Sequence, residues 1–365
     1  QLGLEGQAVD PWVFLSLEDN PHKQLKRAEN YCAKYFQKPR AHNIEKYDGN
    51  KIRIGYFSGN FFEHPVMNLM IRVLELHNKS DFEIYCYGYG PQKKDSYTER
   101  IIKAVDHYKD IRALNDKKAA ELALKDRLNI AIDLMGHTTD TRLGLFSYRV
   151  APIQITYLGC PSTTGAKFID YLIADKTIIE KEDEKFYSEK IIYMPNSYQC
   201  NDNTKIISSK VFTRDELNLK EAKFVFACFN NNFKITPKEY DVWMRILHRI
   251  EGSVLWVLKS NSLAERNLQN EAESRGITSK RIIFADRLPL QEHLARHVCA
   301  DLFLDTFYYN AHTTASDALW AGLPVLTLQG KSFASRVCAS LLKAVDMSEL
   351  ITNNIKEYEE KACYL

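Results

Sequence analysis

The chain has 365 residues, 45% of them hydrophobic and 26% charged, so it is long and apolar enough for two globular domains and unlike a disordered chain. Its formal net charge of +2 is too balanced to indicate nucleic acid as the main partner, so any positive site must be local. The eight cysteines show no C-x-x-C pair and no Cys/His cluster at zinc spacing, which favours buried thiols in a reducing compartment.

Residues 1–50 are polar and helix-prone, with prolines at Pro11, Pro21 and Pro39 that interrupt the pattern. We expect them to form an N-terminal helical segment ahead of the first domain. No signal-peptide core opens the chain, and no window approaches the roughly 18 apolar residues of a membrane span. These features predict a cytoplasmic protein without a membrane span, and the start at Gln1 suggests further sequence upstream.

The character of the chain changes at Lys51, where apolar stretches typical of buried strands begin. The expected strands lie at residues 51–60, 82–90, 129–136 and 153–159, with an amphipathic helix at 66–77. Alternation of strands and helices indicates a parallel sheet covered on both faces. We therefore expect a first Rossmann-like domain at 51–205.

A charged, irregular stretch at about 175–220 is the expected domain junction, after which the alternation starts again. The second series has strands at 223–230, 253–260, 281–286, 301–306 and 324–328 and helices at 237–250, 263–276 and 290–299. It predicts a second Rossmann-like domain at 206–365. Two doubly wound domains in tandem would place a ligand cleft between the carboxyl ends of their strands.

Polar loops follow five of the expected strands, and their residues are candidates for a site at the strand ends. They contain His64, His137, the turn at 160–165, Lys234 and the stretch 307–314. Three of these also have a structural interpretation: His64 as a turn residue before Pro65, Lys234 as a solvated lysine before a helix cap, and 163–165 as a plain turn. His293, in the expected helix at 290–299, could likewise be an exposed helix residue.

The stretch "NAHTTASDALWAGLPVLTL" from Asn310 predicts a short helix followed by a buried strand. Thr314 and Asp317 have capping-box spacing, and Gly322 with the following proline ends the helix. The start of such a helix offers unpaired N–H groups and a partial positive charge, which suit an anion. The alternative is that the threonines only cap the helix.

Several familiar catalytic motifs are absent from the sequence. It has no G-x-x-x-x-G-K-[ST], no complete dinucleotide fingerprint, no G-x-S-x-G, no H-E-x-x-H and no D-x-D at a strand end. We therefore expect a transfer without a metal, in which Lys234 and the helix start at Thr313 and Thr314 would neutralise a diphosphate leaving group.

Eight collinear blocks resemble the catalytic region of the protein O-GlcNAc transferase family, which includes bacterial members and the related Spindly-type O-fucosyltransferases. Among them are "KIRIGYFSGNFFEHPV", "FNNNFKITP", "RIIFADRLPLQEHLAR" and "LDTFYYNAHTTASDALWAGLPVLTL", and the resemblance covers residues 51–360. It implies a GT-B fold and an inverting, metal-independent transfer of a sugar from a nucleotide diphosphate sugar to Ser or Thr of proteins.

The resemblance also implies roles for individual residues. Lys234 would contact the diphosphate, His312, Thr313 and Thr314 would hold sugar and phosphate, Asp317 would bind the ribose, and His293 would pack on the base. His64 would lie beside the acceptor, either as general base or as a positioning group. The expected nucleotide-sugar site comprises Asn231, Lys234, His293, Arg296, His312, Thr313, Thr314 and Asp317. The expected acceptor or sugar pocket comprises His137, Gly159, Pro161 and Thr163.

Some positions depart from the animal O-GlcNAc enzymes. Asn231 stands where those enzymes carry Gln, and Leu290 where they carry a lysine near the ribose, whereas "HPV" and "NAHTTASD" favour the GlcNAc branch. UDP-GlcNAc is thus the expected donor, no cofactor is expected besides it, and protein acceptors are the expected partners. UDP-glucose or GDP-fucose, an Asn acceptor, and a non-catalytic nucleotide-sugar sensor are the alternatives.

The resemblance also bears on domain architecture. No long insert separates the two expected domains, as in bacterial members of the family. Family members usually carry tetratricopeptide repeats before the catalytic region, so we expect such repeats upstream of this sequence.

Overall fold

The computed structural model describes residues 2–36 and 47–365, and these form two compact units. The first unit comprises the residues up to Leu15 together with Asn20–Thr204, and the second comprises Ser16–Asp19 together with Lys205–Leu365. The expected N-terminal segment 1–50 therefore contributes residues to both units, and its part at 37–46 lies outside the described residues.

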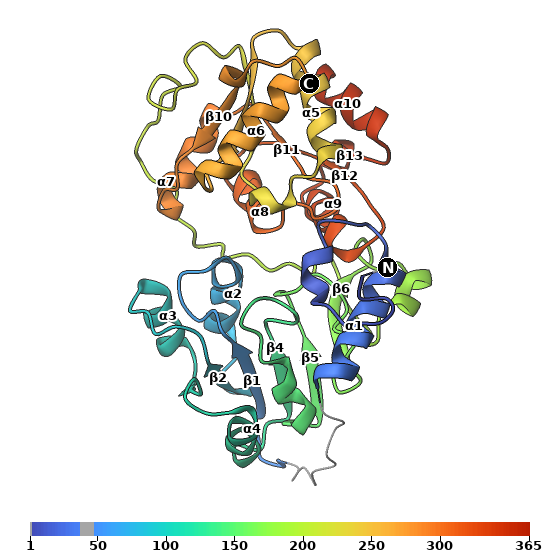
Figure 1. Ribbon diagram of the computed structural model, residues 1–365. Helices are drawn as coiled ribbons and strands as arrows, with labels where there is room; N and C mark the ends of the chain where they lie inside the picture. Colours follow the sequence, from blue (N-terminus) through green and yellow to red (C-terminus); the bar gives the residue numbers. More distant parts are fainter. Residues whose placement is uncertain (1, 37–46) are drawn as a thin grey trace. The chain divides into compact units, whose positions relative to one another are not determined.

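Helix α1 (Pro21–Tyr35) is the main N-terminal element, and it confirms the helix expected there. Asn20 caps it by accepting a hydrogen bond from the backbone N–H of Lys23, and Pro21 occupies the first turn, where its missing N–H costs nothing. The helix packs on the loop after β5: a Cβ added to Gly165 would lie 2.4 Å from the Ala28 carbonyl carbon. In Figure 1 α1 accordingly stands beside the strands β5 and β6 of its own unit.

The first unit is built on a parallel sheet with the strand order β3-β2-β1-β4-β5-β6-β7. Its strands are β1 (Ile52–Ser58), β2 (Phe82–Gly88), β3 (His107–Asp110), β4 (Ile130–Asp133), β5 (Ile153–Thr156), β6 (Tyr171–Asp175) and β7 (Lys190–Met194). Its connecting helices include α2 (Pro65–Leu76), α3 (Ser96–Ala104) and α4 (Asp116–Lys125). The strand order reverses between β1 and β4, which is where open α/β sheets bind ligands.

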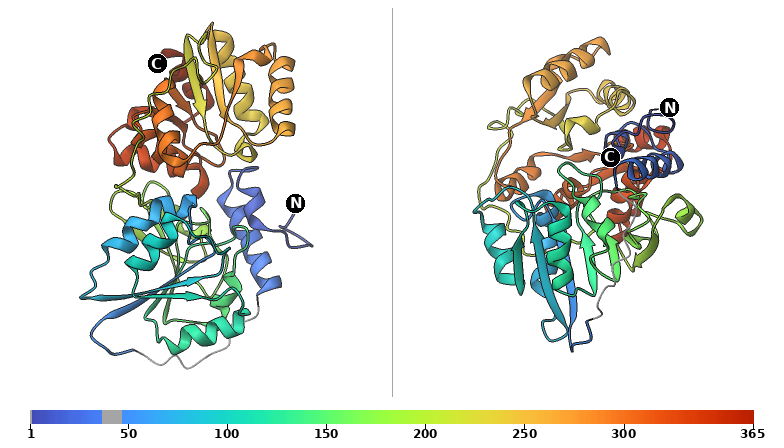
Figure 2. Two further views of the ribbon diagram at one scale, coloured as in Figure 1. Left: turned by 90° about the vertical axis from the view of Figure 1, so that its left-hand side faces the viewer. Right: turned by 60° about the horizontal axis from the view of Figure 1, so that its bottom comes forward.

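The second unit repeats this plan, with the parallel order β10-β9-β8-β11-β12-β13. Its strands are β8 (Phe224–Cys228), β9 (Ser253–Leu258), β10 (Ile282–Ala285), β11 (Leu302–Leu304), β12 (Val325–Leu328) and β13 (Ile351–Thr352). Its helices are α5 (Pro237–Arg249), α6 (Ser262–Ser274), α7 (Leu290–Ala295), α8 (Thr313–Trp320), α9 (Val337–Ala344) and α10 (Ile355–Tyr364). Figure 2 shows the yellow and orange helices of this unit flanking its strands.

The predicted fold class, two Rossmann-like units with parallel sheets, is confirmed. One expectation is wrong: the charged stretch at 175–220 is not irregular throughout, because it contains β7, one of the two edge strands of the first sheet. An edge strand pairs on one side only, and the strand beginning at Lys190 is partly exposed along its length, so it lacks the apolar run of the central strands. The two units divide between Thr204 and Lys205.

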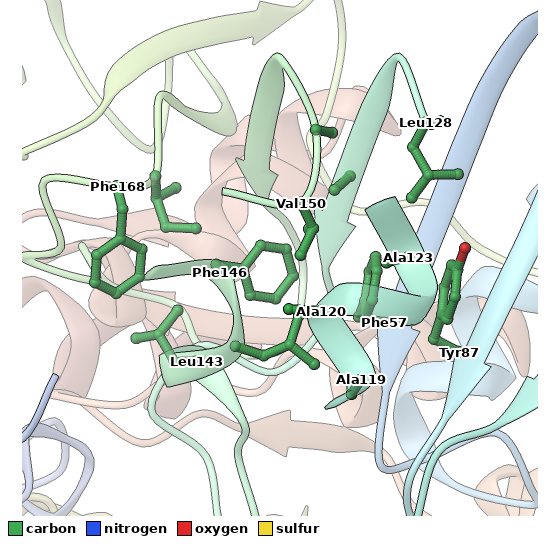
Figure 3. Close-up of a cluster of buried hydrophobic side chains, with 14 of the residues drawn as sticks. Phe57, Tyr87, Ala119, Ala120, Ala123, Leu128, Leu143, Phe146, Val150 and Phe168 are labelled. Atoms are coloured by element: carbon green, nitrogen blue, oxygen red, sulfur yellow. The ribbon is translucent and has the colours of Figure 1, made fainter. Parts of the chain in front are cut away.

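The core beneath the first sheet shows how the predicted strands are held. Phe57 of β1 stacks on Tyr87 of β2 with ring centroids 4.3 Å apart, and it meets Phe146 edge to face at 5.1 Å. Figure 3 shows small residues of α4, Ala120 and Ala123, beside this aromatic cluster. Because their side chains end at Cβ, the helix can approach the sheet closely.

Candidate functional site

The candidate site of the second unit lies where β8 and β11 run side by side, at the point where the strand order reverses. Lys234 follows β8, and His312, Thr313 and Thr314 follow β11. The structure therefore brings the ends of these two loops to one edge of the sheet, as the sequence predicted. This is the edge at which such sheets bind ligands.

Lys234 is held in place by the loop that follows β11. Its Nζ donates a hydrogen bond to the carbonyl oxygen of Asn310 at 2.9 Å and lies 3.8 Å from the centroid of the Tyr309 ring. Burial lowers the pKa of Lys234 to about 8, and the negative charge of Asp305 opposes that shift. Lys234 is therefore an ammonium ion at neutral pH with a fixed position, unlike a solvated surface lysine.

Asp305, which was not predicted from the sequence, holds this loop in place through hydrogen bonds to its side chain. Its Oδ1 accepts hydrogen bonds from the backbone N–H groups of Thr306 at 2.8 Å and Ala311 at 2.5 Å, so one oxygen closes the loop from both ends. Its Oδ2 accepts from the hydroxyl of Thr327 in β12 at 2.7 Å. Burial raises the pKa of Asp305 to about 6, against the lowering effect of these hydrogen bonds. The carboxylate is thus charged at neutral pH and faces the ammonium of Lys234.

The start of α8 differs from the predicted capping box. The helix begins at Thr313 with His312 at the N-cap, and within the described structure the side chain of His312 makes no capping hydrogen bond. The hydroxyl of Thr314 donates instead to Oδ1 of Asn230 at 2.5 Å, across to the loop after β8. The expectation that Thr314 and Asp317 cap the helix is therefore wrong, because both side chains have partners outside the helix. The first turn keeps N–H groups that can face an anion.

Asp317 forms a buried ion pair with Lys205, at 2.8 Å between Oδ1 and Nζ. The side chains are 6% and 1% exposed, respectively, so water screens the pair little. Burial raises the pKa of Asp317, although the charge of Lys205 opposes the shift. The residue assigned to the ribose thus already has one cationic partner in this structure, and Lys205 is a second residue that the sequence analysis missed.

His293 and Arg296 belong to a separate aromatic cluster next to β8. The Nε of Arg296 donates to Nδ1 of His293 at 3.0 Å, and the ring of Phe229 lies 5.1 Å from the His293 ring. Burial, together with the positive charges around it, lowers the pKa of His293 to about 2, so its ring is neutral. His297 packs on the same phenylalanine at 5.0 Å. A neutral ring beside flat aromatic and guanidinium groups can stack on a planar ligand.

Asn231 is exposed, and its Oδ1 accepts only a long bond of 3.4 Å from the backbone of Phe233 among the contacts described. Its neighbour Asn230 is the buried one, with Nδ2 donating to the hydroxyl of Thr306 at 2.9 Å and Oδ1 accepting from Thr314. The sequence "NNN" gave no signal for telling these neighbours apart. The structure places Asn230, rather than Asn231, between the two strand-end loops.

In the first unit His64 is the N-cap of α2. Its Nδ1 accepts a hydrogen bond from the backbone N–H of Val66 at 3.2 Å. Burial lowers the pKa of His64 to about 4, with a further contribution from the charge of Lys93. The ring is therefore neutral above about pH 5 and, with Nδ1 accepting, carries its proton on Nε2. Nε2 is then a hydrogen-bond donor.

The structure brings His137 together with the loop after β5, but it buries them deeply. The Nε2–H of His137 donates to the carbonyl oxygen of Thr164 at 2.7 Å, and its buried Nδ1 has no partner within the described residues. Thr163 donates its hydroxyl to Glu189 at 2.7 Å and is 1% exposed. A Cβ on Gly159 would lie 2.1 Å from the carbonyl oxygen of Leu134, so this position requires glycine. Pro161 is buried in the same loop.

Comparison with known proteins identifies the family to which the sequence is similar. The model of glycosyl transferase family 41 matches residues 27–211 and 203–365. A mutant O-GlcNAc transferase from Thermobaculum terrenum superposes with a TM-score of 0.85 and 28% identity, covering 96% of this chain and 67% of that one. This likeness confirms the GT-B class.

Plant relatives give the same result at the level of sequence. The probable UDP-N-acetylglucosamine–peptide N-acetylglucosaminyltransferase SEC of Arabidopsis thaliana is 37% identical over 86% of this chain and 33% of its own length. The SPINDLY protein of the same plant is 32% identical over 84% of this chain and 34% of its own length. The chain spans about a third of these relatives. Because the family model covers nearly the whole sequence, the chain belongs to glycosyl transferase family 41.

Proposed function

We propose that this chain transfers a sugar, GlcNAc from UDP-GlcNAc, to the hydroxyl of Ser or Thr in proteins, with inversion and without a metal. The acceptor oxygen would form a bond to the anomeric carbon as the bond from that carbon to the β-phosphate oxygen breaks. UDP would leave with the electron pair, and the hydroxyl proton would pass to a base or to the departing phosphate. Inversion follows from a single displacement.

The observation that carries this proposal is the placement of Lys234 against the loop that leads into α8. A departing diphosphate gains negative charge on its β-phosphate, so positive charge must be fixed where that charge grows. Lys234 supplies an ammonium ion, and the first turn of α8 supplies unpaired N–H groups beside it. The neutral rings around Phe229 would hold the planar base at the same end of β8.

The donor assignment draws on the relatives. SEC and the Caenorhabditis elegans relative are named for transfer of N-acetylglucosamine from UDP-GlcNAc to peptides, and this chain is more similar to SEC, at 37% identity, than to the SPINDLY protein of the same plant, at 32%. UDP-glucose and GDP-fucose are the competing donors, and a sensor that binds without turnover is the competing class. Protein acceptors and upstream tetratricopeptide repeats belong to the same proposal.

UDP is expected to stabilise the chain against thermal unfolding, and GDP is not. A ligand at about a hundredfold excess over its dissociation constant adds about 2.7 kcal/mol to the free energy of unfolding. A thermal-shift series with UDP, GDP, UDP-GlcNAc, UDP-glucose and GDP-fucose measures this. Stabilisation by GDP and its sugar alone would assign the chain to the fucosyl branch, and stabilisation by UDP-GlcNAc without turnover on any protein acceptor would favour the sensor.

EDTA is expected to leave the transfer rate unchanged. In the proposed mechanism Lys234 and backbone N–H groups stabilise the charge that grows on the leaving group, so no divalent ion is needed for that step. Initial rates with and without EDTA, and with added Mg²⁺ or Mn²⁺ as the control, test this. Strict dependence on a divalent ion would contradict the metal-free mechanism.

No helix of the described residues is long and apolar enough to cross a membrane. We propose a cytoplasmic location, as the sequence analysis expected.

A further inference from the structure

A short N-terminal stretch, Ser16–Asp19, belongs to the second unit although more than 180 residues separate it from the rest of that unit. Its carboxylate, Asp19, accepts hydrogen bonds from the backbone N–H groups of Lys331 at 2.8 Å and Ser332 at 2.7 Å. It also accepts from the hydroxyl of Ser335 at 2.7 Å. A Cβ on Gly330 would lie 2.5 Å from Oδ2 of Asp19, so glycine there leaves room for the carboxylate.

The segment that Asp19 holds, residues 330–335, contacts the proposed donor site directly. The carbonyl oxygen of Ala334 accepts hydrogen bonds from the backbone N–H of Asn310 at 2.9 Å and from Nε2 of His312 at 3.1 Å. The carbonyl oxygen of Asn310 in turn accepts from Nζ of Lys234. A continuous series of hydrogen bonds therefore leads from Asp19 through the 330–335 segment to His312 and Lys234.

We propose that Asp19 is a positioning residue for the nucleotide-sugar site: it fixes the 330–335 segment and thereby the orientation of His312 and of the Asn310 carbonyl. The proposal rests on the proposed function, since it assumes that this site binds a nucleotide diphosphate. It assigns the N-terminal stretch a part in donor binding that the expectation of a simple helical linker did not include.

The physical basis is a charged acceptor that serves three donors on one short segment. Hydrogen bonds to a charged group are stronger than neutral ones, and two of these three donors are backbone N–H groups that an uncharged isostere cannot satisfy equally. Without Asp19 the 330–335 segment can open locally while the strands of the sheet stay paired. Ala334 would then no longer present its carbonyl to His312.

The tautomer of the His312 imidazole depends on its contact with the carbonyl oxygen of Ala334. Because a carbonyl oxygen accepts from Nε2, the neutral ring carries its proton on Nε2, with Nδ1 left as the acceptor nitrogen. Burial lowers the pKa of His312 well below its usual value, and the charge of Lys234 contributes, so the ring is neutral at working pH. Displacement of Ala334 would remove the group that selects this tautomer.

The test compares Asp19→Asn with Asp301→Asn in the full 365-residue chain. Both changes are isosteric and remove one charge. Asp301 lies at the opposite end of β11, where its Oδ2 accepts from Arg214 and from the backbone N–H of Val225, both at 2.7 Å. We expect Asp19→Asn to raise the dissociation constant of UDP, measured by calorimetry, about tenfold, equivalent to about 1.4 kcal/mol. Asp301→Asn should lower the melting temperature and leave UDP binding unchanged.

A second readout is the tautomer of His312, followed by nitrogen NMR, which should lose its preference for the Nε2–H form in Asp19→Asn but not in Asp301→Asn. If Asp19→Asn does not fold, Ser335→Ala, which removes one of the three donors, should raise the dissociation constant of UDP about threefold, or about 0.7 kcal/mol. UDP binding equal to the parent, or an equal loss in both Asp→Asn variants, would overturn the proposal. A parent chain that does not bind UDP would contradict the proposed function, and the NMR comparison would then decide the role of Asp19.

Discussion

Replacing Lys234 by alanine is expected to lower kcat about 10²-fold or more, as the loss of a preorganised donor to a developing oxyanion does. The ammonium would interact more strongly with the departing diphosphate than with the bound donor, so its loss should affect kcat beyond any change in KM. The measurement is the initial rate of sugar transfer at saturating UDP-GlcNAc. Melting temperature serves as the check on folding.

Lys238 provides the matched control because it lies one turn further on, in α5, with Nζ 3.4 Å from the hydroxyl of Tyr308 and largely exposed. Lys238→Ala removes the same charge from the same region and should keep activity within a few-fold of the parent. If Lys234→Ala behaved like Lys238→Ala, Lys234 would have no part in stabilising the leaving group.

The pH dependence of the reaction follows from the same lysine. Because burial lowers the pKa of Lys234 to about 8, its charge is complete well below pH 8 and is lost as the pH rises through that value. We expect kcat/KM to fall along this limb, and Lys234→Arg to remove the limb because a guanidinium stays charged. Three other groups face Lys234, and none of them changes its charge near pH 8. Asp305 has a pKa of about 6 and is anionic in this range, the thiol of Cys228 has a raised pKa and is neutral, and the ring of His312 is also neutral.

The central strands of each sheet could be predicted from the sequence because they are buried on both faces. Such strands form continuous apolar runs, as in "KIRIGYFS" and "SVLWVL", and those runs became β1 and β9. Four of the described strands were not among those expected, β3, β6, β7 and β13, and all but β6 lie at a sheet edge. At an edge a strand pairs on one side only, and the residues of β3 and β7 are accordingly exposed or partly exposed. The alternation with helices predicted that the strands run parallel, whereas their order within each sheet comes from the structure.

The candidate site was predicted to the level of its loops but not of its supporting contacts. Residues that follow a strand can be read from the sequence, and Lys234 and His312 were placed in this way. Asp305 holds its own loop, through the backbone N–H groups of Thr306 and Ala311, and no sequence motif marks its side chain as their acceptor. Lys205 and Asp19 could not be placed either, because each acts on a segment distant along the chain, 112 residues away for Lys205 and 312 to 316 for Asp19. A lone carboxylate or ammonium in a sequence gives no sign of such a partner.

The structure also favours one of the two roles considered for His64, general base or positioning group. A general base must present a nitrogen without a proton to the acceptor hydroxyl. The backbone N–H of Val66 donates to Nδ1, so the proton of the neutral ring lies on Nε2, and that nitrogen is a donor. A pKa of about 4 also makes the ring a weak base at neutral pH. Both features favour a positioning role, in which Nε2–H would donate to the acceptor or the sugar.

We therefore expect His64→Ala to raise the KM for the acceptor about tenfold and to lower kcat by much less than the 10²- to 10⁴-fold, approximately, that removal of a general base costs. UDP affinity should change little. The substitution also removes the N-cap of α2, which costs about 0.5 to 2 kcal/mol of stability, so its effects must be separated from the loss of the cap.

His64→Asn makes that separation, because asparagine caps a helix as well as any residue and lacks the imidazole. The asparagine variant should recover the melting temperature of the parent and keep the raised KM, which assigns the KM effect to Nε2–H rather than to the helix. Steady-state kinetics over a range of acceptor concentrations, at saturating donor, measure both constants. A fall in kcat of about 10²-fold or more in both variants with KM unchanged would show that His64 is the base after all, and would require its ring to exchange the Val66 hydrogen bond for the other tautomer when the acceptor binds.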